Sequence, residues 1–502
     1  MLITILVYLA AMVGIGAVLA KQNQTTDDFY LGGRTLGPLV TAMSAEASDM
    51  SSWLLMGLPG VAYLSGTADA AWTAIGLAIG TYVNWLVVAM RLRNYTHVCG
   101  NSTTLPLFFS NRYRDNKRIL SVIAALLIII FFVPYTASGF AACGKLFANL
   151  FGMDYLPAML ISAIVIVAYT TLGGFLAAST TDFVQSIVMT IAIVVVFGFG
   201  ISKVGSFSAV MDNAKSMAGY FSLTHTHDVA TGTASPYSLL QIFSTLAWGL
   251  GYFGMPHVLL RFMAIGDANK LKLSRRVATV WVVSSMAVSV FIGVIGNAMT
   301  KAGVLPTLKD PETIILVVAD LISKHGVLAT IIAGLILAGI LAATMSTADS
   351  QLLAASSSAS QNILKEVFMK DMSEKTGMLI ARITVLVIAL IGVFIARNPD
   401  SSVFQIVSFA WAGFGASFGP LVLLALFWKR STFQGALCGM VSGGVMVFVW
   451  KFLIRPMGGA LGIYELLPAF LLGLAVNVIV SLLTPAPSRE VQDEFDKVAS
   501  MK

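Results

Sequence analysis

Apolar stretches of about 20 residues recur from one end of this chain to the other, and each is long enough to cross a bilayer as a helix. Only 11% of the residues are charged, whereas a soluble domain carries roughly a quarter. Mean hydropathy is +0.86, so soluble packing could not cover the apolar surface. The sequence therefore predicts an all-α polytopic membrane protein with thirteen transmembrane helices. Their expected ranges are 2–20, 39–64, 70–90, 119–149, 157–175, 182–203, 237–259, 278–300, 326–350, 377–396, 402–427, 433–454 and 464–484.

The basic residues predict how these helices are oriented, because cytoplasmic loops carry an excess of Lys and Arg. With the N-terminus outside, 22 of the 31 Lys and Arg residues lie in loops and helix ends on the cytoplasmic side. We therefore expect an N-out, C-in arrangement in the plasma membrane, which would be the inner membrane of a bacterium. This arrangement also explains the net charge of +7 without a nucleic-acid partner.

Two of the expected spans contain residues that interrupt a helix. The second span, 39–64, holds Glu46, Asp49 and several serines in its middle, and the seventh, 237–259, holds glycines and Pro256. Backbone groups freed at membrane depth are tolerated where they line a cavity or bind a ligand. Each interrupted helix opens a set of five, and an odd number reverses the direction of the second set. Inverted five-helix repeats of this kind are typical of secondary transporters, with the substrate site at the breaks.

The repeats divide the chain into six parts. We expect the external loop to be mobile and the C-terminal tail to be frayed, because both are polar. The loop contains His225 and His227, an H-x-H pair that could bind a metal, although two incidental histidines are the simpler interpretation. The parts are 1–38 (first span and connecting segment), 39–203 (first five-helix repeat), 204–236 (external loop), 237–427 (second, inverted repeat), 428–484 (last two spans) and 485–502 (cytoplasmic tail).

The break in the second span has suitable chemistry for binding a zwitterion and a cation. Ser and Asp are poor inside helices but good N-caps. A half-helix that starts near Ser51 would point its positive dipole end at an anionic group, such as a substrate carboxylate. The half that ends near Ala47 would leave carbonyls free for a cation, and a carboxylate as deep as Asp49 implies a function. The alternative is a kinked helix whose serine hydroxyls bond back to its own carbonyls.

A stripe of small hydroxyl residues lies on the ninth span. Ala343, Ser346 and Thr347 stand at i, i+3 and i+4, so one carbonyl and two hydroxyls share a helical face. Hard cations take oxygen ligands, and neutral oxygens together with carbonyls of the second span would suit a monovalent ion. Ser346, Asp349 and Ser350 repeat the spacing one turn nearer the cytoplasm. Plain packing between helices is the alternative use of such small hydroxyls.

Six longer motifs contain these residues, and at them the chain resembles the sodium/proline symporters of the solute:sodium symporter family. The resemblance implies a leucine-transporter-type core in spans 2–11 and import of L-proline driven by sodium entry. The motifs are DDFYLGGRTLGP (27–38), SAEASDMSSWLLMGLPG (44–60), GGFLAASTTDFVQ (173–185), WGLGYFGMPHVLLRF (248–262), ILAATMSTADSQLL (340–353) and SFAWAGFGASFGP (408–420).

The resemblance also implies roles for individual residues. The carbonyls of Ala47, Met50 and Ala343 would bind sodium together with the hydroxyls of Ser346 and Thr347. Asp49 would couple sodium binding to transport. The substrate pocket would be shaped by Ser51, Tyr135, Trp248, Tyr252 and Pro256.

The residues themselves agree with a proline pocket. Trp248 and Tyr252 are four apart in the interrupted seventh span, and aromatic faces suit both an apolar ring and a cation. Membrane aromatics also serve as interfacial anchors, but these two lie between glycines within a span. One departure from the family pattern stands beside the pocket, since Glu46 occupies a position where a small residue is expected.

A second cation site is the sharpest hypothesis from the sequence. Asp182 is expected at the cytoplasmic start of the sixth span, and the resemblance implies that the sixth and ninth spans are neighbours. Asp182, Ser346, Asp349 and Ser350 would then surround a cation, because two close carboxylates do not both stay charged cheaply without a cation or a proton between them. The alternative is that Asp182 caps its helix and Asp349 meets cytoplasmic water.

Other functions remain as alternatives. A symporter of the same family for another small solute, such as another amino acid, betaine or a carboxylate, is the nearest. A membrane sensor is the alternative from a different class, and an enzyme is disfavoured because no P-loop, G-x-S-x-G or H-E-x-x-H motif is present. We expect no cofactor besides the co-transported sodium ion, and no partners other than L-proline, sodium and the lipid bilayer.

Overall fold

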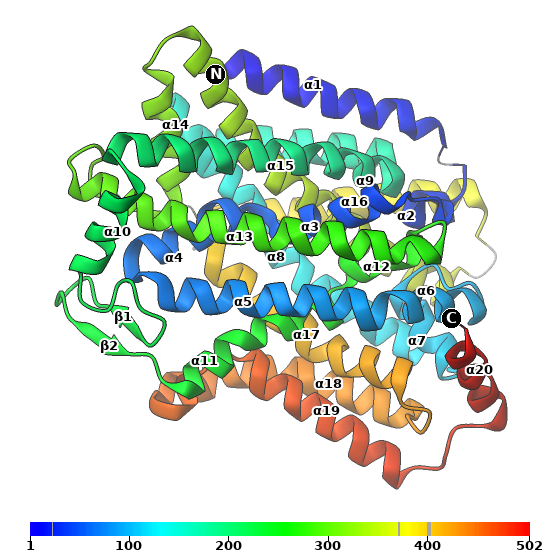
Figure 1. The fold of residues 1–502 in the computed structure, drawn as a ribbon. Helices are drawn as coiled ribbons and strands as arrows, with labels where there is room; N and C mark the ends of the chain where they lie inside the picture. The colour runs from blue at the N-terminus through cyan, green and yellow to red at the C-terminus, as the bar shows by residue number, and fades with distance from the viewer. Residues whose placement is uncertain (23, 370–371, 399–402, 502) are drawn as a thin grey trace.

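The computed structural model describes residues 1–22, 24–369, 372–398 and 403–501. This part of the chain is helical apart from one two-stranded hairpin and the connecting loops (Figure 1). Ten of its helices are long and apolar enough to cross a membrane. The predicted all-helical membrane fold is therefore confirmed at this level. The ten are Leu2–Gln22, Thr67–Val98, Ile119–Ala148, Thr170–Val204, Ala268–Lys301, Val327–Phe368, Glu374–Ile395, Val403–Phe427, Phe433–Met457 and Leu466–Leu483.

The α-helices are numbered along the chain, as in Figure 1. The first ten are α1 (Leu2–Leu19), α2 (Thr26–Leu31), α3 (Pro38–Ser52), α4 (Leu58–Ser65), α5 (Thr67–Val83), α6 (Ala89–Val98), α7 (Leu105–Arg112), α8 (Ile119–Phe151), α9 (Tyr155–Val204) and α10 (Phe207–Ser216). The others are α11 (Leu239–Leu246), α12 (Pro256–Ala264), α13 (Leu271–Lys301), α14 (Ile314–Ser323), α15 (Val327–Ser357), α16 (Glu374–Ile395), α17 (Val403–Phe427), α18 (Phe433–Val449), α19 (Leu466–Leu483) and α20 (Arg489–Ser500). Three segments with other helical geometry are used below: the π-helical η3 (Trp53–Gly57) and η4 (Asn84–Val88), and the 3-10 segment η5 (Ala247–Gly254).

Helix α9 joins two of the expected spans without a loop between them. The sequence predicts a connection just before Asp182, but that stretch is helical, and the two segments meet at a bend at Gly174, where φ is 61° and ψ is −165°. Glycine reaches such angles because it has no Cβ. Asp182 therefore lies well inside a helix and is fully buried, so its expected position at the start of a span was wrong.

The segment between α9 and α11 is anchored to the helices rather than loose along its length. It contains α10 and an antiparallel hairpin of β1 (His225–His227) and β2 (Ala234–Pro236). Tyr220 is fully buried, and its hydroxyl donates to the carbonyl of Ala62 at 2.7 Å. The prediction of a mobile loop missed this anchor, because a single buried tyrosine gives no periodic signal.

The C-terminal tail forms helix α20, which contradicts the prediction of a frayed end. Val491, Phe495 and Val498 are buried and stand at i, i+4 and i+7, so they form one apolar face. The guanidinium groups of Arg91 and Arg112 lie 4.8 and 5.5 Å from the centre of the Phe495 ring. The tail is thus held by an apolar stripe that its polar composition conceals.

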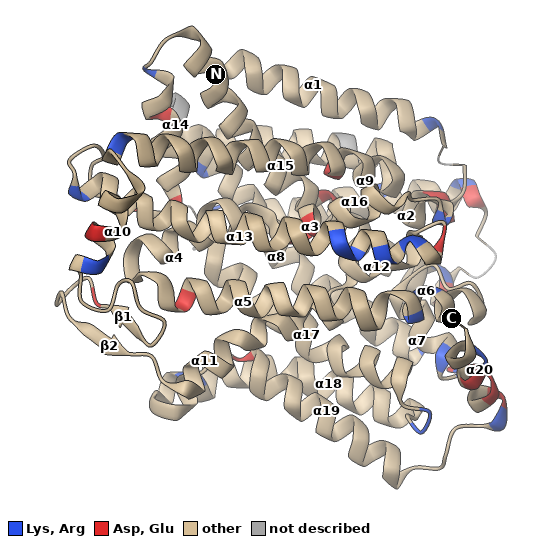
Figure 2. Cartoon of the chain, viewed as in Figure 1, with Lys and Arg blue, Asp and Glu red and all other residues tan. Residues whose placement is uncertain are grey.

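Many of the basic residues gather at the end of the molecule where α6, α7, α12 and α20 lie (Figure 2).

Close packing in the interior depends on glycine where α5 crosses η5. A Cβ on Gly80 would lie only 2.4 Å from the carbonyl oxygen of Gly249. The backbone of η5 is therefore held directly against the face of α5 that continues into η4.

Candidate functional site

The predicted break in the second span is confirmed at Ser51. This residue has φ 49° and ψ −172° between two helical stretches, a conformation that costs free energy for a residue with a side chain. The Ser51 hydroxyl accepts a hydrogen bond from the backbone N–H of Trp53 at 3.0 Å, as an N-cap residue does. The chain therefore ends one half-helix near Met50 and starts another directly after Ser51.

The seventh expected span is also discontinuous. Helix α11 passes into the 3-10 segment η5, Met255 is extended, and α12 begins at Pro256 in the favoured first position. Gly251 allows α17 to approach η5, because a Cβ there would lie 2.0 Å from the indole nitrogen of Trp411. The two interrupted helices thus leave irregular backbone in the protein interior, as the sequence predicts.

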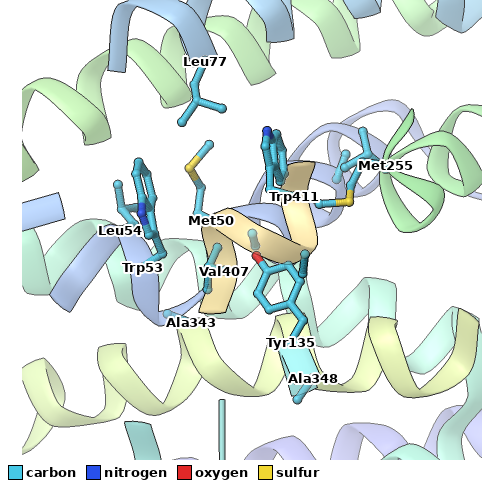
Figure 3. Close-up of a cluster of buried hydrophobic side chains, with 14 of the residues drawn as sticks. Met50, Trp53, Leu54, Leu77, Tyr135, Met255, Ala343, Ala348, Val407 and Trp411 are labelled. Atoms are coloured by element: carbon cyan, nitrogen blue, oxygen red, sulfur yellow. The ribbon is translucent and has the colours of Figure 1, made fainter. Parts of the chain in front are cut away.

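A small cavity lies beside the break at Ser51, with a volume of about 10 Å³, about the room that one water molecule needs. Trp248 lines it, and its ring packs against Trp53 at 5.6 Å and stacks on Tyr464 at 5.1 Å between ring centroids. The indole of Trp411 donates to the backbone carbonyl of Trp248 at 2.7 Å, so the Trp411 ring is held against η5. Figure 3 shows several of these side chains converging. The cavity is lined by Asp49, Met50, Trp53, Leu77, Tyr135, Trp248, Val407 and Trp411.

Three of the predicted pocket and coupling residues, Asp49, Tyr135 and Trp248, line this cavity. Tyr252 lies next to it, with its ring edge-on to Trp411 at 5.1 Å between centroids. Ser51 and Pro256 do not line the cavity, and instead shape the backbone at the two breaks.

The sequence analysis missed Trp53, Leu77, Val407 and Trp411. Trp53 follows the break by two residues, so its place in the sequence could have singled it out. Trp411 lies in the motif at 408–420, but no break in its helix marks it as a binding residue. Leu77 and Val407 differ from other apolar residues of their spans in no way that the sequence shows.

Asp49 connects the two interrupted helices. Its Oδ2 accepts a hydrogen bond from the Tyr252 hydroxyl at 2.5 Å, and its backbone carbonyl accepts one from the Tyr135 hydroxyl at 3.4 Å. Its other carboxylate oxygen, Oδ1, has no hydrogen-bond partner among the residues that the structure describes. Asp49 therefore offers a buried acceptor at the edge of the cavity.

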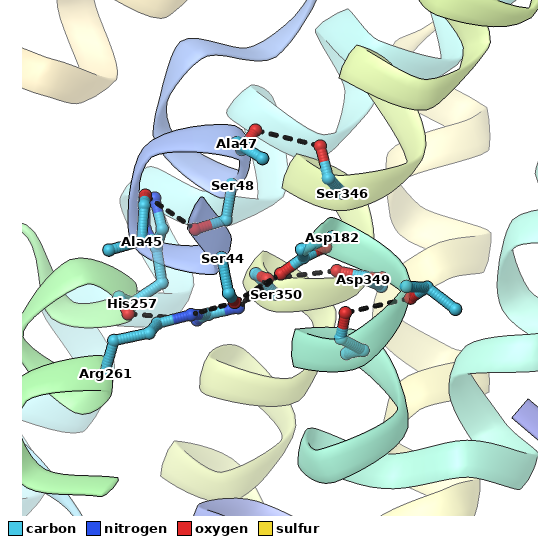
Figure 4. A network of polar contacts seen from close by, with 12 residues as sticks. Ser44, Ala45, Ala47, Ser48, Asp182, His257, Arg261, Ser346, Asp349 and Ser350 are labelled. Carbon is cyan, nitrogen blue, oxygen red and sulfur yellow. Dashed lines mark hydrogen bonds and ion pairs between the residues drawn. The ribbon is translucent and has the colours of Figure 1, made fainter. Parts of the chain in front are cut away.

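Four of the five predicted sodium ligands lie together between α3 and α15. The Ser346 hydroxyl donates to the carbonyls of Ala47 at 2.8 Å and Ala343 at 3.2 Å, and the Thr347 hydroxyl reaches the Ala343 carbonyl at 3.1 Å. Figure 4 shows the link between Ser346 and Ala47. The fifth predicted ligand, Met50, lies one turn beyond Ala47 and lines the cavity. None of the hydrogen bonds described for Ser346 and Thr347 involves Met50. The neutral, buried oxygens fit a monovalent cation.

Two of the four residues of the hypothetical second cation site, Asp182 and Ser350, contact a basic side chain that the sequence did not place there. Arg261 donates from Nη2 to Asp182 at 3.1 Å and to the Ser350 hydroxyl at 2.5 Å (Figure 4). The Ser350 hydroxyl in turn donates to Asp349 at 3.0 Å. Ser346 bonds to Ala47 instead.

Arg261 is one of the basic residues counted in the cytoplasmic loops and helix ends, yet it is only 1% exposed. Its Nε donates to the Ser44 hydroxyl at 3.0 Å, and Ser44 donates to the same Asp182 oxygen at 2.6 Å. The guanidinium therefore compensates the charge of Asp182, and breaking such a buried pair costs about 3–5 kcal/mol.

Similarity to known proteins extends over nearly the whole chain. The family model of the sodium:solute symporter family matches residues 29–443. The sodium/proline symporter of Salmonella typhimurium is 41% identical over 502 residues, covering 99% of this chain and 96% of that protein. The osmoregulated proline transporter of Bacillus subtilis is 40% identical over 489 residues, covering 97% and 96%.

Solved structures share the fold at lower sequence identity. A Na⁺-coupled sialic acid symporter in a substrate-bound, outward-open state matches with a TM-score of 0.79 at 18% identity, covering 97% of this chain and 98% of that one. A nucleobase-cation-symport-1 family transporter matches with a TM-score of 0.56 at 16% identity, covering 93% and 98%. These neighbours have the leucine-transporter-type fold, which confirms the expected fold type. With a family model that spans most of its length and relatives at about 40% identity, the chain belongs to the sodium:solute symporter family.

Proposed function

We propose that this protein imports L-proline together with sodium by alternating access. The observation that carries the proposal is the meeting of three features within α3: the break at Ser51, the carboxylate of Asp49, and the Ala47 carbonyl bonded to Ser346 of α15. The names of relatives at 40–41% identity support proline and sodium as the cargo. In this proposal the protein transports its substrate and does not convert it, and transport uses no cofactor other than the co-transported sodium ion.

The cavity has the chemistry that a small zwitterion with an apolar ring requires. The free Oδ1 of Asp49 would accept the substrate ammonium group. Trp53, Trp248 and Trp411 would cover the ring, and their faces also favour a nearby positive charge. The N-terminal end of the half-helix after Ser51 would face the carboxylate with its positive dipole.

Sodium binding would act on the substrate site through the backbone of α3. Ala47, a proposed ligand, stands two residues before Asp49 on the same helical turn. A cation bound between Ala47, Ala343, Ser346 and Thr347 would hold this turn against α15 and fix the position of the Asp49 side chain. Substrate affinity would then depend on sodium, which is the requirement for coupled transport.

We also propose the topology in full: thirteen spans, N-out and C-in, in the plasma membrane of a bacterium. Two inverted repeats, 39–203 and 237–427, would form the core, with the first span, the external loop 204–236, the last two spans and the tail outside them. In this assignment α9 supplies two spans that meet at Gly174. The basic end of the molecule at α6, α12 and α20 would face the cytoplasm (Figure 2).

The second cation site is proposed in a form that includes Arg261. In a state that is closed to the cytoplasm, the guanidinium would occupy the place between Asp182 and Ser350. Opening would withdraw α12 and its arginine, and a sodium ion leaving through Ser346, Asp349 and Ser350 would replace it. The same carboxylates would thus be neutralised in turn by a fixed cation and by a passing one.

The experiment that tests the cargo is competition in proteoliposomes. Unlabelled proline, other amino acids, betaine and small carboxylates are offered against labelled proline in the presence of a sodium gradient. Proline itself should compete best. A stronger competitor would assign the protein to the alternative, a sodium-coupled symporter of the same family for another small solute.

A further inference from the structure

Two acidic side chains lie buried one turn apart on α3. Glu46 is 1% exposed and Asp49 is 6% exposed, and their spacing of three residues places them on neighbouring parts of the helix surface. In the described ranges, no Lys, Arg or His side chain bonds to either carboxyl group. Burying carboxylates without compensation at membrane depth is costly enough to require a ligand or a partner.

Each carboxyl group has one oxygen bonded and one oxygen free. Glu46 Oε1 accepts from the Trp85 indole at 2.8 Å, and Asp49 Oδ2 accepts from the Tyr252 hydroxyl at 2.5 Å. The remaining oxygens, Glu46 Oε2 and Asp49 Oδ1, are buried and have no hydrogen-bond partner in the part of the chain that the structure covers. Both acids thus have acceptor capacity that the protein itself does not use.

Two further oxygens beside them are in the same condition. Thr81 and Asn84 are at most 1% exposed, and Thr81 Oγ1 and Asn84 Oδ1 have no partner among the described side chains and backbone. Thr81, Asn84 and Trp85 stand at i, i+3 and i+4 along α5 and η4, so they share one face. This is the face that also supplies the indole bonded to Glu46.

The contacts close a ring around these oxygens. The Asn84 amide donates from Nδ2 to the backbone carbonyl of Tyr252 at 3.1 Å, and the Tyr252 hydroxyl donates to Asp49. Trp85 completes the ring by its bond to Glu46. The unpartnered oxygens come from α3 and from the α5–η4 face, and Tyr252 of η5 ties these two segments together.

We propose that Glu46, Asp49, Thr81 and Asn84 form an additional binding site for a monovalent cation, the Glu46 site, and that the cation is sodium in the working protein. A single proton shared by the two carboxyl groups would satisfy only their own oxygens, whereas a cation accepts all four oxygens as ligands. The inference rests on the proposed function, because the sodium ion and the substrate ammonium together balance the two carboxylates. The site is separate from the one at Ser346 and Thr347.

The test is ²²Na⁺ binding to the purified full chain in detergent without proline. With Arg261 in place between Asp182 and Ser350, the wild-type chain should bind two ions, one at Ser346 and Thr347 and one at Glu46. Glu46→Gln and Thr81→Val should each bind one. Glutamine retains the size of Glu46 and an oxygen for Trp85. The matched control is Thr73→Val, because the Thr73 hydroxyl is equally buried on α5 but donates to the Asp69 carbonyl at 2.8 Å; this variant should keep two ions.

The outcomes separate this site from the rest of the account. Ser346→Ala should also lose one ion, and Glu46→Gln combined with Ser346→Ala should lose both. If the wild type binds only one ion, and only Ser346→Ala removes it, the site at Glu46 is wrong while the site at Ser346 and Thr347 stands. Uptake or release of one proton by the wild type, with a sodium count that Glu46→Gln and Thr81→Val leave unchanged, would assign the two acids to a proton and overturn the proposal.

Discussion

The hydroxyl of Ser346 donates a hydrogen bond to the backbone carbonyl of Ala47 at 2.8 Å, and this contact joins α15 to the half of α3 that ends at the break. Ala47 and Asp49 belong to the same turn, and Asp49 reaches the other interrupted helix through Tyr252. A shift of the Ser346 side chain would therefore reach the cavity through the short stretch of α3 backbone between Ala47 and Asp49. This short path is the structural basis for coupling the ion to the substrate.

Substitutions in the hydroxyl stripe should separate ion binding from packing. Ser346→Ala and Thr347→Ala each remove one proposed ligand, and each should raise the sodium concentration for half-maximal uptake by about tenfold, a loss of about 1.4 kcal/mol. Thr347→Ser keeps the hydroxyl and should have a much smaller effect. Equal damage from both changes at Thr347 would mean that its methyl group matters for packing and that the hydroxyl does not bind sodium.

The stripe and the break were predictable because both leave a local pattern. Ala343, Ser346 and Thr347 follow helical spacing, and Ser51 lies among serines and an aspartate in a span that is otherwise apolar. Arg261 was not predictable in the same way. A basic residue at the end of a span is normally exposed in a loop, and only the packing of both α12 and α9 against α3 brings Arg261 to the partner that makes burial possible.

Trp248→Ala should weaken proline binding by at least about tenfold, because its ring lines the cavity and packs between Trp53 and Tyr464. Sodium binding in the absence of proline should change little, since the side chains described in contact with this ring are aromatic and supply no ion ligand. Equilibrium binding of labelled proline and of ²²Na⁺ measures the two effects separately. Trp450→Phe is the control, because the Trp450 indole bonds to the Ile463 carbonyl away from the cavity. Equal losses for both ligands would indicate a folding defect.

Removing Asp182 should destabilise the protein, because it leaves the buried guanidinium of Arg261 without its charged partner. Asp182→Ala should cost about 3–5 kcal/mol of unfolding free energy. Replacing both residues, as Asp182→Leu with Arg261→Met, should recover most of that loss while abolishing any sodium dependence that the pair provides. Denaturation of the purified variants in detergent gives the free energies. If the double variant is as unstable as the single one, the two side chains are not energetically coupled.

The C-terminal helix gives a prediction that is independent of transport. Phe495→Ala removes the side chain that lies against Arg91 and Arg112, so α20 should detach and its backbone amides should exchange as fast as those of an exposed segment. The matched control is Asp493→Ala, an exposed position on the same helix that should leave exchange unchanged. Continued protection of α20 in Phe495→Ala would show that its ion pairs with Arg114 hold it without the ring.

Accumulation of labelled proline in proteoliposomes tests the central claim most directly. One sodium ion moving down about 100 mV releases about 2.3 kcal/mol, and a tenfold sodium gradient adds about 1.4 kcal/mol. Together they support accumulation of a neutral solute to at least about 500-fold. We predict that uptake approaches this level with a sodium gradient and collapses when choline replaces sodium. Full uptake sustained by a proton gradient without sodium would contradict the account.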